Sequence, residues 1–167
     1  MGGGPPSGSA EDLANFVVAG SRVPDFAALP PLPPPRDLRG ASPVVRRRLR
    51  FGLGGGMGAG MRFTIDGREF DPARVDQRVP AGSVEEWTII NPTPMDHPLH
   101  LHVWPMQVIA EEGRTVDDVT WQDVVDVPAG SEVTVRIAFD DFPGRTVYHC
   151  HNLDHEDGGM MGVVEAR

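Results

Sequence analysis

Lysine is missing from this 167-residue sequence, cysteine occurs once, and long apolar runs are absent. All 15 basic residues are therefore arginine, and 24 acidic residues bring the formal net charge to -9. This charge argues against nucleic acid or an anionic membrane surface as a partner. No run approaches the roughly 18 consecutive apolar residues of a membrane span, so no span is expected. The single cysteine, Cys150, excludes an internal disulfide and any metal site that needs two thiolates from one chain.

The N-terminal part of the chain is rich in proline and glycine. Residues 1–43 include the run Leu29-Pro-Pro-Leu-Pro-Pro-Pro35, which favours extended polyproline geometry. We expect residues 1–43 to form an extended arm or an inter-domain linker, with a short helix as a candidate within residues 10–20. A proline-motif ligand for a partner domain is the alternative interpretation of this arm.

From residue 44 onward, apolar and polar residues alternate with the period of β-strands. Glycine, proline, asparagine and aspartate separate the runs and mark turns between them. Strand-like runs cover residues 48–53, 61–65, 84–90, 99–110, 124–127, 133–139, 145–150 and 161–165. About eight short strands within about 120 residues are typical of a β-sandwich or barrel. The sequence therefore predicts a single all-β domain over residues 44–167.

All six histidines lie in two short segments of this domain. The first is His97-Pro-Leu-His100-Leu-His102, and the second is His149-Cys150-His151-Asn-Leu-Asp-His155. Alternate residues of a strand point to the same side, so His149 and His151 share a face opposite to that of Cys150. The second segment therefore contributes side chains to two different sites.

On the side of Cys150, the spacing predicts a group of four metal ligands: His97, Cys150, His155 and Met160. Two imidazoles, one thiolate and a long axial thioether are the ligand set of a blue copper centre. Soft sulfur and imidazole ligands together accommodate both oxidation states of copper, so we expect a redox-active site. Zinc would accept the same donors without redox chemistry, and a zinc-stapled or metal-free domain is the alternative.

The two segments resemble the motifs HPxHLH and HCHxxxHxxxGM of the C-terminal cupredoxin domain of multicopper oxidases, the laccase-like and cuprous-oxidase-like enzymes. The resemblance covers about residues 44–167 and implies a Greek-key sandwich or barrel of cupredoxin type. It implies that the type 1 copper ligands are His97, Cys150, His155 and Met160. It also implies that the remaining copper ligands are His100 for type 2 copper and His102, His149 and His151 for the type 3 pair.

The resemblance implies an oxidase mechanism. A small reducing substrate, a phenol, an aromatic amine or a metal ion, would give electrons to the type 1 copper. The electrons would pass from Cys150 through His149 and His151 to a trinuclear copper cluster, where O2 is reduced to water. Glu156 matches a family position associated with proton delivery and is the further catalytic candidate. A surface carboxylate is the alternative interpretation of Glu156.

The family's trinuclear cluster uses eight histidines, and this sequence supplies four of them. In the family the other four come from two HxH pairs of another cupredoxin domain. We expect them from upstream domains of a longer protein, from a second chain, or from a second copy of this chain. A free-standing blue copper electron-transfer protein is the alternative function, and a copper-binding module without catalysis is another. The first residues show no secretory signal pattern, whereas the resemblance suggests the periplasm or the cell exterior.

Overall fold

The computed structural model describes residues 14–22, 29–55 and 60–167, and the chain divides into two units, residues 1–33 and 34–167. In the first unit, residues 14–22 and 29–33 form no helix or strand. The short helix expected within residues 10–20 is therefore absent from residues 14–20, and the rest of that range lies outside the described residues. Isolated helices of this length gain too few hydrogen bonds to offset the cost of nucleation.

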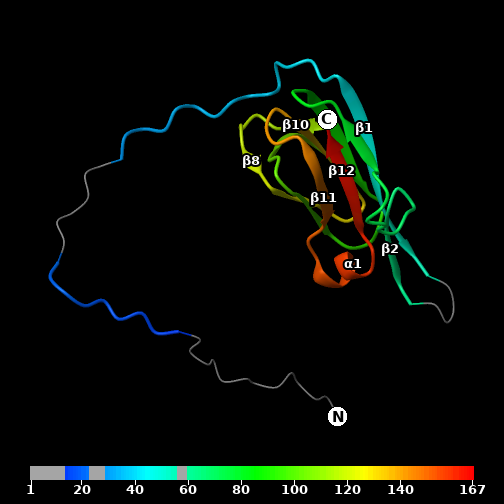
Figure 1. Ribbon diagram of the computed structural model, residues 1–167, viewed down its shortest axis with the longest axis horizontal. Coiled ribbons are helices and arrows are strands. Elements are labelled where there is room, and N and C mark those ends of the chain that lie inside the picture. Colours follow the sequence, from blue (N-terminus) through cyan, green and yellow to red (C-terminus); the bar gives the residue numbers. More distant parts are fainter. Residues whose placement is uncertain (1–13, 23–28, 56–59) are drawn as a thin grey trace, which may run out of the picture. The chain divides into compact units, whose positions relative to one another are not determined.

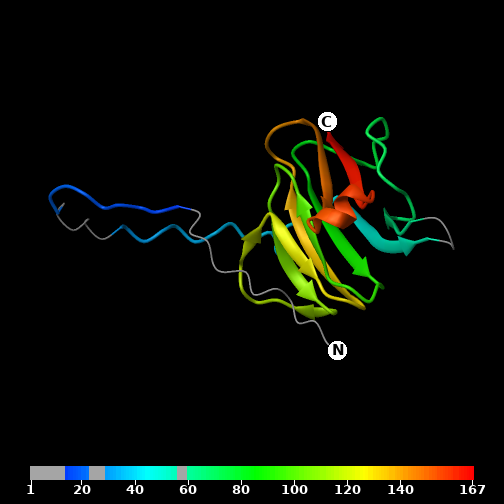
Figure 2. The ribbon, with the colours of Figure 1, turned by 90° about the horizontal axis from the view of Figure 1, so that it is seen from below.

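The second unit is a sandwich of two β-sheets, which confirms the all-β prediction (Figures 1 and 2). The first sheet contains, in spatial order, β2 (Arg62–Ile65), β1 (Val45–Gly54), β4 (Val84–Asn91), β10 (Ser131–Ala138), β6 (Met106–Glu111) and β7 (Arg114–Thr115), with β8 (Trp121–Gln122) paired to β6. The second sheet contains, in spatial order, β3 (Gln77–Val79), β12 (Met161–Ala166), β11 (Gly144–Cys150), β5 (His97–Leu101) and β9 (Val124–Val127).

The core lies between the sheets and follows from the alternation of the strands. In β4 every second residue is buried, and this inward series consists of Glu85, Trp87, Ile89 and Asn91. Trp87 packs edge-on against Tyr148 of β11, with the ring centroids 5.8 Å apart. Burial of each large apolar side chain contributes about 1.5 to 3 kcal/mol. The two polar members of the series need partners inside the protein, because an unpaired buried polar group is costly.

The continuous strand expected over residues 99–110 is wrong. The structure has two strands there, β5 and β6, which belong to different sheets. The residues between them, 102–105, carry the chain from one sheet to the other. Val103 has a left-handed backbone (φ 77°), and Pro105 has no N–H group for a strand ladder, so neither continues a strand. Three strands of two or three residues, β3, β7 and β8, were not predicted because they are too short to show alternation.

One short helix, α1 (Leu153–Asp157), connects β11 to β12 at the end of the sandwich away from the C-terminus (Figure 1). β12 then runs back antiparallel to β11, which pairs His149 with Met161. The turn is held by backbone bonds from Cys150 N–H to the Met160 carbonyl (3.0 Å) and from Met160 N–H to the His155 carbonyl (2.9 Å). These bonds bring three predicted copper ligands together. Among the described residues, no helix has the length and apolar character to cross a bilayer.

Residues 34–43, called the strap below, pack on the sandwich just before β1. Leu38 is buried within the strap, and its N–H donates to the side-chain oxygen of Gln107 at 2.7 Å. The guanidinium of Arg136 in β10 donates to the carbonyls of Leu38, Arg39 and Ala41 at 2.6 to 2.8 Å. Arg136 therefore holds the strap against the first sheet.

Candidate metal centre

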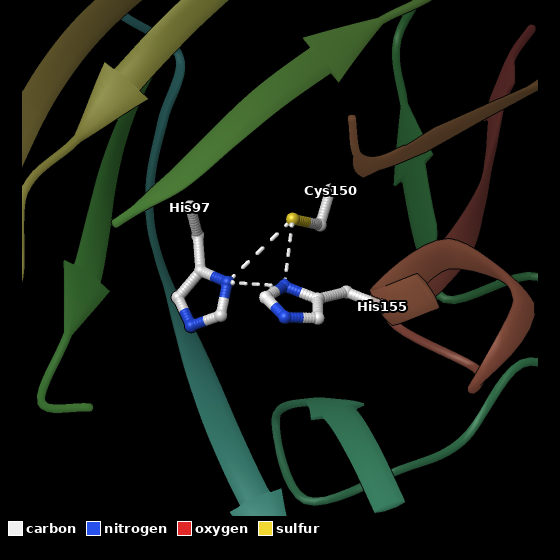
Figure 3. A group of neighbouring side chains, drawn as sticks. All are labelled: His97, Cys150 and His155. Carbon is white, nitrogen blue, oxygen red and sulfur yellow. Dashed lines mark hydrogen bonds between the residues drawn. The ribbon is translucent and has the colours of Figure 1, made fainter. Parts of the chain in front are cut away.

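Three side chains from different elements meet in the first donor group (Figure 3). His97 begins β5, Cys150 ends β11, and His155 lies on α1. The Sγ of Cys150 lies 3.5 Å from the Nδ1 of His97 and 3.5 Å from the Nδ1 of His155. The two Nδ1 atoms are 3.0 Å apart. His97 and Cys150 are fully buried and His155 is 9% exposed, so the three donors converge on a space largely shielded from water.

The electrostatics of this group suit a metal ion. Burial, and next the neighbouring His155, lower the pKa of His97 to about 4, and burial also lowers the pKa of His155. Both imidazoles are therefore neutral near pH 7 and offer lone pairs. Burial raises the pKa of the Cys150 thiol, so a thiolate here requires a compensating cation. Two imidazoles and one thiol that converge within 3.5 Å, with a buried methionine next in the fold, are a donor set that fits copper.

Met160, the predicted fourth ligand, is fully buried, and its backbone bonds join it to Cys150 and His155. Two aromatic rings flank the histidines of this group. Phe63 stacks on His155 with the ring centroids 4.3 Å apart, and Phe51 meets His97 edge-on at 5.2 Å. These apolar contacts fix the imidazole planes and keep water out.

The second donor group contains the other histidines. His100, His102 and His149 offer ligand atoms that all lie within 4.8 Å of one another. The Nε2 atoms of His102 and His149 are 3.1 Å apart. The ring of His151 lies 5.3 Å from that of His100 and 5.8 Å from that of His149, measured between centroids. The structure thus brings the four histidines predicted for the second site into one cluster, separate from the group around Cys150.

Two acceptors orient rings of this cluster. The Nδ1 of His100 lies 2.8 Å from the carbonyl oxygen of Asp123, and the Nδ1 of His149 lies 3.0 Å from Oε2 of Glu156. A carbonyl oxygen and a carboxylate both accept, so each Nδ1 carries the proton and each Nε2 keeps its lone pair. Burial lowers the pKa of His102, and the neighbouring His100 and His149 lower it further. His102 is therefore a neutral imidazole donor near pH 7.

Sequence reasoning missed two residues beside the first group: Thr93, which contacts His97, and Asn91, which contacts Thr93. The hydroxyl of Thr93 lies 2.8 Å from the Nε2 of His97, and the side-chain oxygen of Asn91 lies 2.7 Å from that hydroxyl. A signal for Asn91 was present, because it continues the inward alternation of residues 85, 87 and 89 with a polar side chain. Thr93 follows the strand in an irregular segment, where no periodicity indicates the direction of a side chain.

A two-sheet sandwich that carries a His-Cys-His group beside a buried methionine, together with a separate histidine cluster, defines a copper-binding domain of cupredoxin type. The chain belongs to the multicopper oxidase family and corresponds to its C-terminal cupredoxin domain. Residues 44–167 match the family model described as multicopper oxidase. The ligand groups are consistent with a type 1 copper site and with histidines of a trinuclear cluster.

Individual relatives agree with this assignment. The chain is 34% identical over 168 residues to a bilirubin oxidase of Albifimbria verrucaria, which covers 93% of this chain and 28% of the relative. It is 33% identical over 108 residues to a multicopper oxidase of Staphylococcus aureus, which covers 61% of this chain and 24% of the relative. The solved multicopper oxidase of Campylobacter jejuni, a metallo-oxidase, superposes with a TM-score of 0.69 at 30% identity, covering 77% of this chain and 31% of that one. The chain thus spans about a quarter to a third of the length of these relatives.

Proposed function

We propose that residues 44–167 are the electron-accepting domain of a laccase-like multicopper oxidase that oxidises a small reductant, a phenol, an aromatic amine or a metal ion. His97, Cys150, His155 and Met160 hold type 1 copper, His100 holds type 2 copper, and His102, His149 and His151 hold the type 3 pair. When bound, copper supplies one-electron transfer at the first group and the reduction of O2 to water at the second. The observation that carries the proposal is that two consecutive residues of β11, His149 and Cys150, contribute to two separate donor groups.

The residues of the first group bind copper in a site built for little rearrangement. Two neutral imidazoles and one thiol already converge at 3.0 to 3.5 Å, and the rings of Phe51 and Phe63 fix the imidazole planes. A site that changes little between oxidation states favours fast electron transfer, because few atoms have to move.

The two groups are connected through the backbone of β11. His149 and His151 are the chain neighbours of Cys150, and the two imidazoles belong to the second group while the thiol belongs to the first. The connection between the groups is therefore covalent and one residue long. With copper bound, this short bonded connection would be the route by which electrons leave the first group.

Glu156 delivers protons to the histidine cluster, where the reduction of O2 consumes them. Its carboxylate accepts the Nδ1 proton of His149 at 3.0 Å, and its side chain is 32% exposed, so it connects the cluster with solvent. Glu156 orients His149 through this bond and exchanges protons with water on its exposed side.

The second group is incomplete within this chain, which supplies four histidines to it. Four further histidines from another cupredoxin domain or a second chain complete the cluster of the family. Their source determines whether the chain acts as one domain of a longer oxidase, as a subunit, or as part of a self-associated assembly.

Copper stoichiometry and O2 consumption test this proposal. The copper-loaded chain is expected to hold one strongly blue copper, and Cys150→Ser is expected to abolish the blue absorption. Addition of the domain or chain that bears the missing histidines is expected to raise the copper content and start reductant-dependent O2 uptake. One copper per chain with no O2 uptake in any such assembly would instead favour the free-standing electron-transfer protein.

A further inference from the structure

A chain of buried hydrogen bonds leads from Asn91 through Thr93 to His97, on the side of the imidazole away from Cys150. Asn91 ends β4, His97 begins β5, and Thr93 lies between them. The exposed fractions are 0% for Asn91, 6% for Thr93 and 0% for His97. Hydrogen bonds shielded from water in this way have few alternative partners, so the position of each proton follows from its neighbours.

The orientation of the Asn91 amide is determined by three carbonyl groups. Its Nδ2 lies 2.8 Å from the carbonyl oxygens of Met95 and Val127 and 3.0 Å from that of Pro128. Carbonyl oxygens only accept, so the NH2 group must be on this side. The Oδ1 atom is consequently turned toward Thr93, where it also accepts the Thr93 backbone N–H at 3.1 Å.

The single proton of the Thr93 hydroxyl follows from this orientation. The hydroxyl oxygen lies 2.7 Å from the Oδ1 of Asn91 and 3.1 Å from the carbonyl of Met95, and both of these atoms are acceptors. If the hydroxyl donated to His97 instead, two oxygens would face each other at 2.7 Å without a proton between them. The hydroxyl therefore donates to oxygen and accepts the Nε2–H of His97 at 2.8 Å.

We infer that Asn91 and Thr93 are positioning residues of the copper site, which hold His97 as the Nε2–H tautomer with the Nδ1 lone pair directed toward Cys150 and His155. The opposite tautomer would place a proton where the metal has to bind. The bond to Thr93 also prevents rotation of the ring before copper arrives. This inference deepens the proposed function and rests on it.

Two substitutions at Thr93 separate the hydroxyl from the volume of the side chain. Thr93→Val keeps the shape and removes the acceptor, whereas Thr93→Ser keeps the acceptor and removes a methyl group. We expect Thr93→Val to weaken copper binding about 10- to 100-fold in a competition titration and to shift the sulfur-to-copper absorption band. Thr93→Ser is expected to stay within about threefold of the unchanged chain, since it retains the acceptor.

Thr88→Val is the matched control for these variants. Thr88 lies on β4, and its hydroxyl is 3.1 Å from that of Thr134, so this variant also removes a hydroxyl from a half-buried pair of the first sheet. It should leave copper affinity and the absorption band unchanged. The inference is overturned if Thr93→Val binds copper like the unchanged chain, or if Thr93→Ser loses as much affinity as Thr93→Val.

A second measurement needs neither a variant nor copper. Two-bond proton-nitrogen correlation spectra of the nitrogen-15-labelled, metal-free chain report the tautomer of each histidine. We expect His97 to carry its proton on Nε2, and a proton on Nδ1 would overturn the inference. If the unchanged chain bound no copper, the proposed function would fail, while this spectrum would still decide the tautomer.

Discussion

Cys150 and His149 are consecutive residues of β11, yet their side chains belong to different donor groups. The thiol of Cys150 lies 3.5 Å from the Nδ1 of His155, and the Nε2 of His149 lies 3.1 Å from that of His102. The alternation of a strand separates these neighbours by directing them to opposite faces. Two consecutive residues of one strand thereby contribute ligands to two different sites.

This separation predicts that the two groups can be disabled independently. Cys150→Ser removes the soft ligand of the first group and leaves the second group unchanged. The blue absorption should disappear, whereas the copper bound by the histidine cluster of an assembled enzyme should remain. Metal analysis with electron paramagnetic resonance measures both, and loss of all copper from the assembled variant would contradict the prediction.

Glu156→Gln tests the proton function of the carboxylate. Glutamine can still accept the Nδ1–H of His149 through its side-chain oxygen, but it cannot take up a proton. In the assembled enzyme we expect the rate of O2 reduction to fall about 10- to 100-fold and its pH profile to change, with little change in copper content. Asp157→Asn is the control, because that carboxylate is exposed on the same helix. An unchanged rate and pH profile would show that Glu156 has no proton function and is a surface carboxylate.

Gly162→Ala probes the packing behind β11. A Cβ at Gly162 would lie 2.4 Å from the ring and hydroxyl of Tyr148, which is fully buried and packs on Trp87. We expect the free energy of unfolding to drop by about 1 to 3 kcal/mol, because the ring has to move within a filled core. Gly40→Ala meets no atom within 4 Å and should change stability by less than about 0.5 kcal/mol. Chemical denaturation of the two variants measures the difference.

Arg136→Met should loosen the strap. The Arg136 side chain is 12% exposed and bonds to three strap carbonyls and to Glu86, so its loss removes donors from four part-buried acceptor groups. We expect a loss of about 3 kcal/mol in unfolding free energy and faster proteolysis within residues 34–43. Arg46→Met removes the other partner of Glu86. The Arg46 side chain is 68% exposed, so this substitution should cost about 0 to 1 kcal/mol. Equal effects of the two substitutions would contradict this account.

Glu86 makes the domain sensitive to acid. Burial by itself would raise the pKa of Glu86, but the bonds from Arg136 and Arg46 outweigh burial and hold the pKa below its ordinary value of 4.5. The contribution of ionised Glu86 to the free energy of unfolding is therefore complete above about pH 4.5. It is lost as the pH falls through the lower pKa that Glu86 has in the folded state. In the metal-free chain, unfolding free energy measured from pH 6 to pH 3 should fall less steeply for Glu86→Gln than for the unchanged chain. Equal slopes would show that Glu86 is not responsible.

Much of the site could be predicted because its information is local in sequence. The order His149, Cys150, His151 fixes which side chains share a face once the segment is a strand, and the structure separates them accordingly. The alternation of β4 and β10 likewise identified the core strands. These predictions depend only on the period of a strand, which holds wherever one face is buried.

The remaining features depend on contacts between distant segments. The crossing at Val103 requires a left-handed valine, which local preference disfavours and tertiary packing imposes. The bond from His100 to the Asp123 carbonyl joins residues 23 positions apart. Every residue type has a backbone carbonyl, so the sequence does not indicate which one accepts this bond. The roles of Asn91 and Thr93 likewise depend on the connection from β4 of the first sheet to β5 of the second, which brings Thr93 to His97.

The antiparallel ladder of β11 has a consequence for both donor groups at once. His149 is aligned with His100 on one side and with Met161 on the other. A slip of this strand by a single position would turn the sulfur outward and an imidazole inward, exchanging sulfur and nitrogen donors between the two faces. Correct alignment during folding therefore decides which metal chemistry each face acquires, before any ion is present.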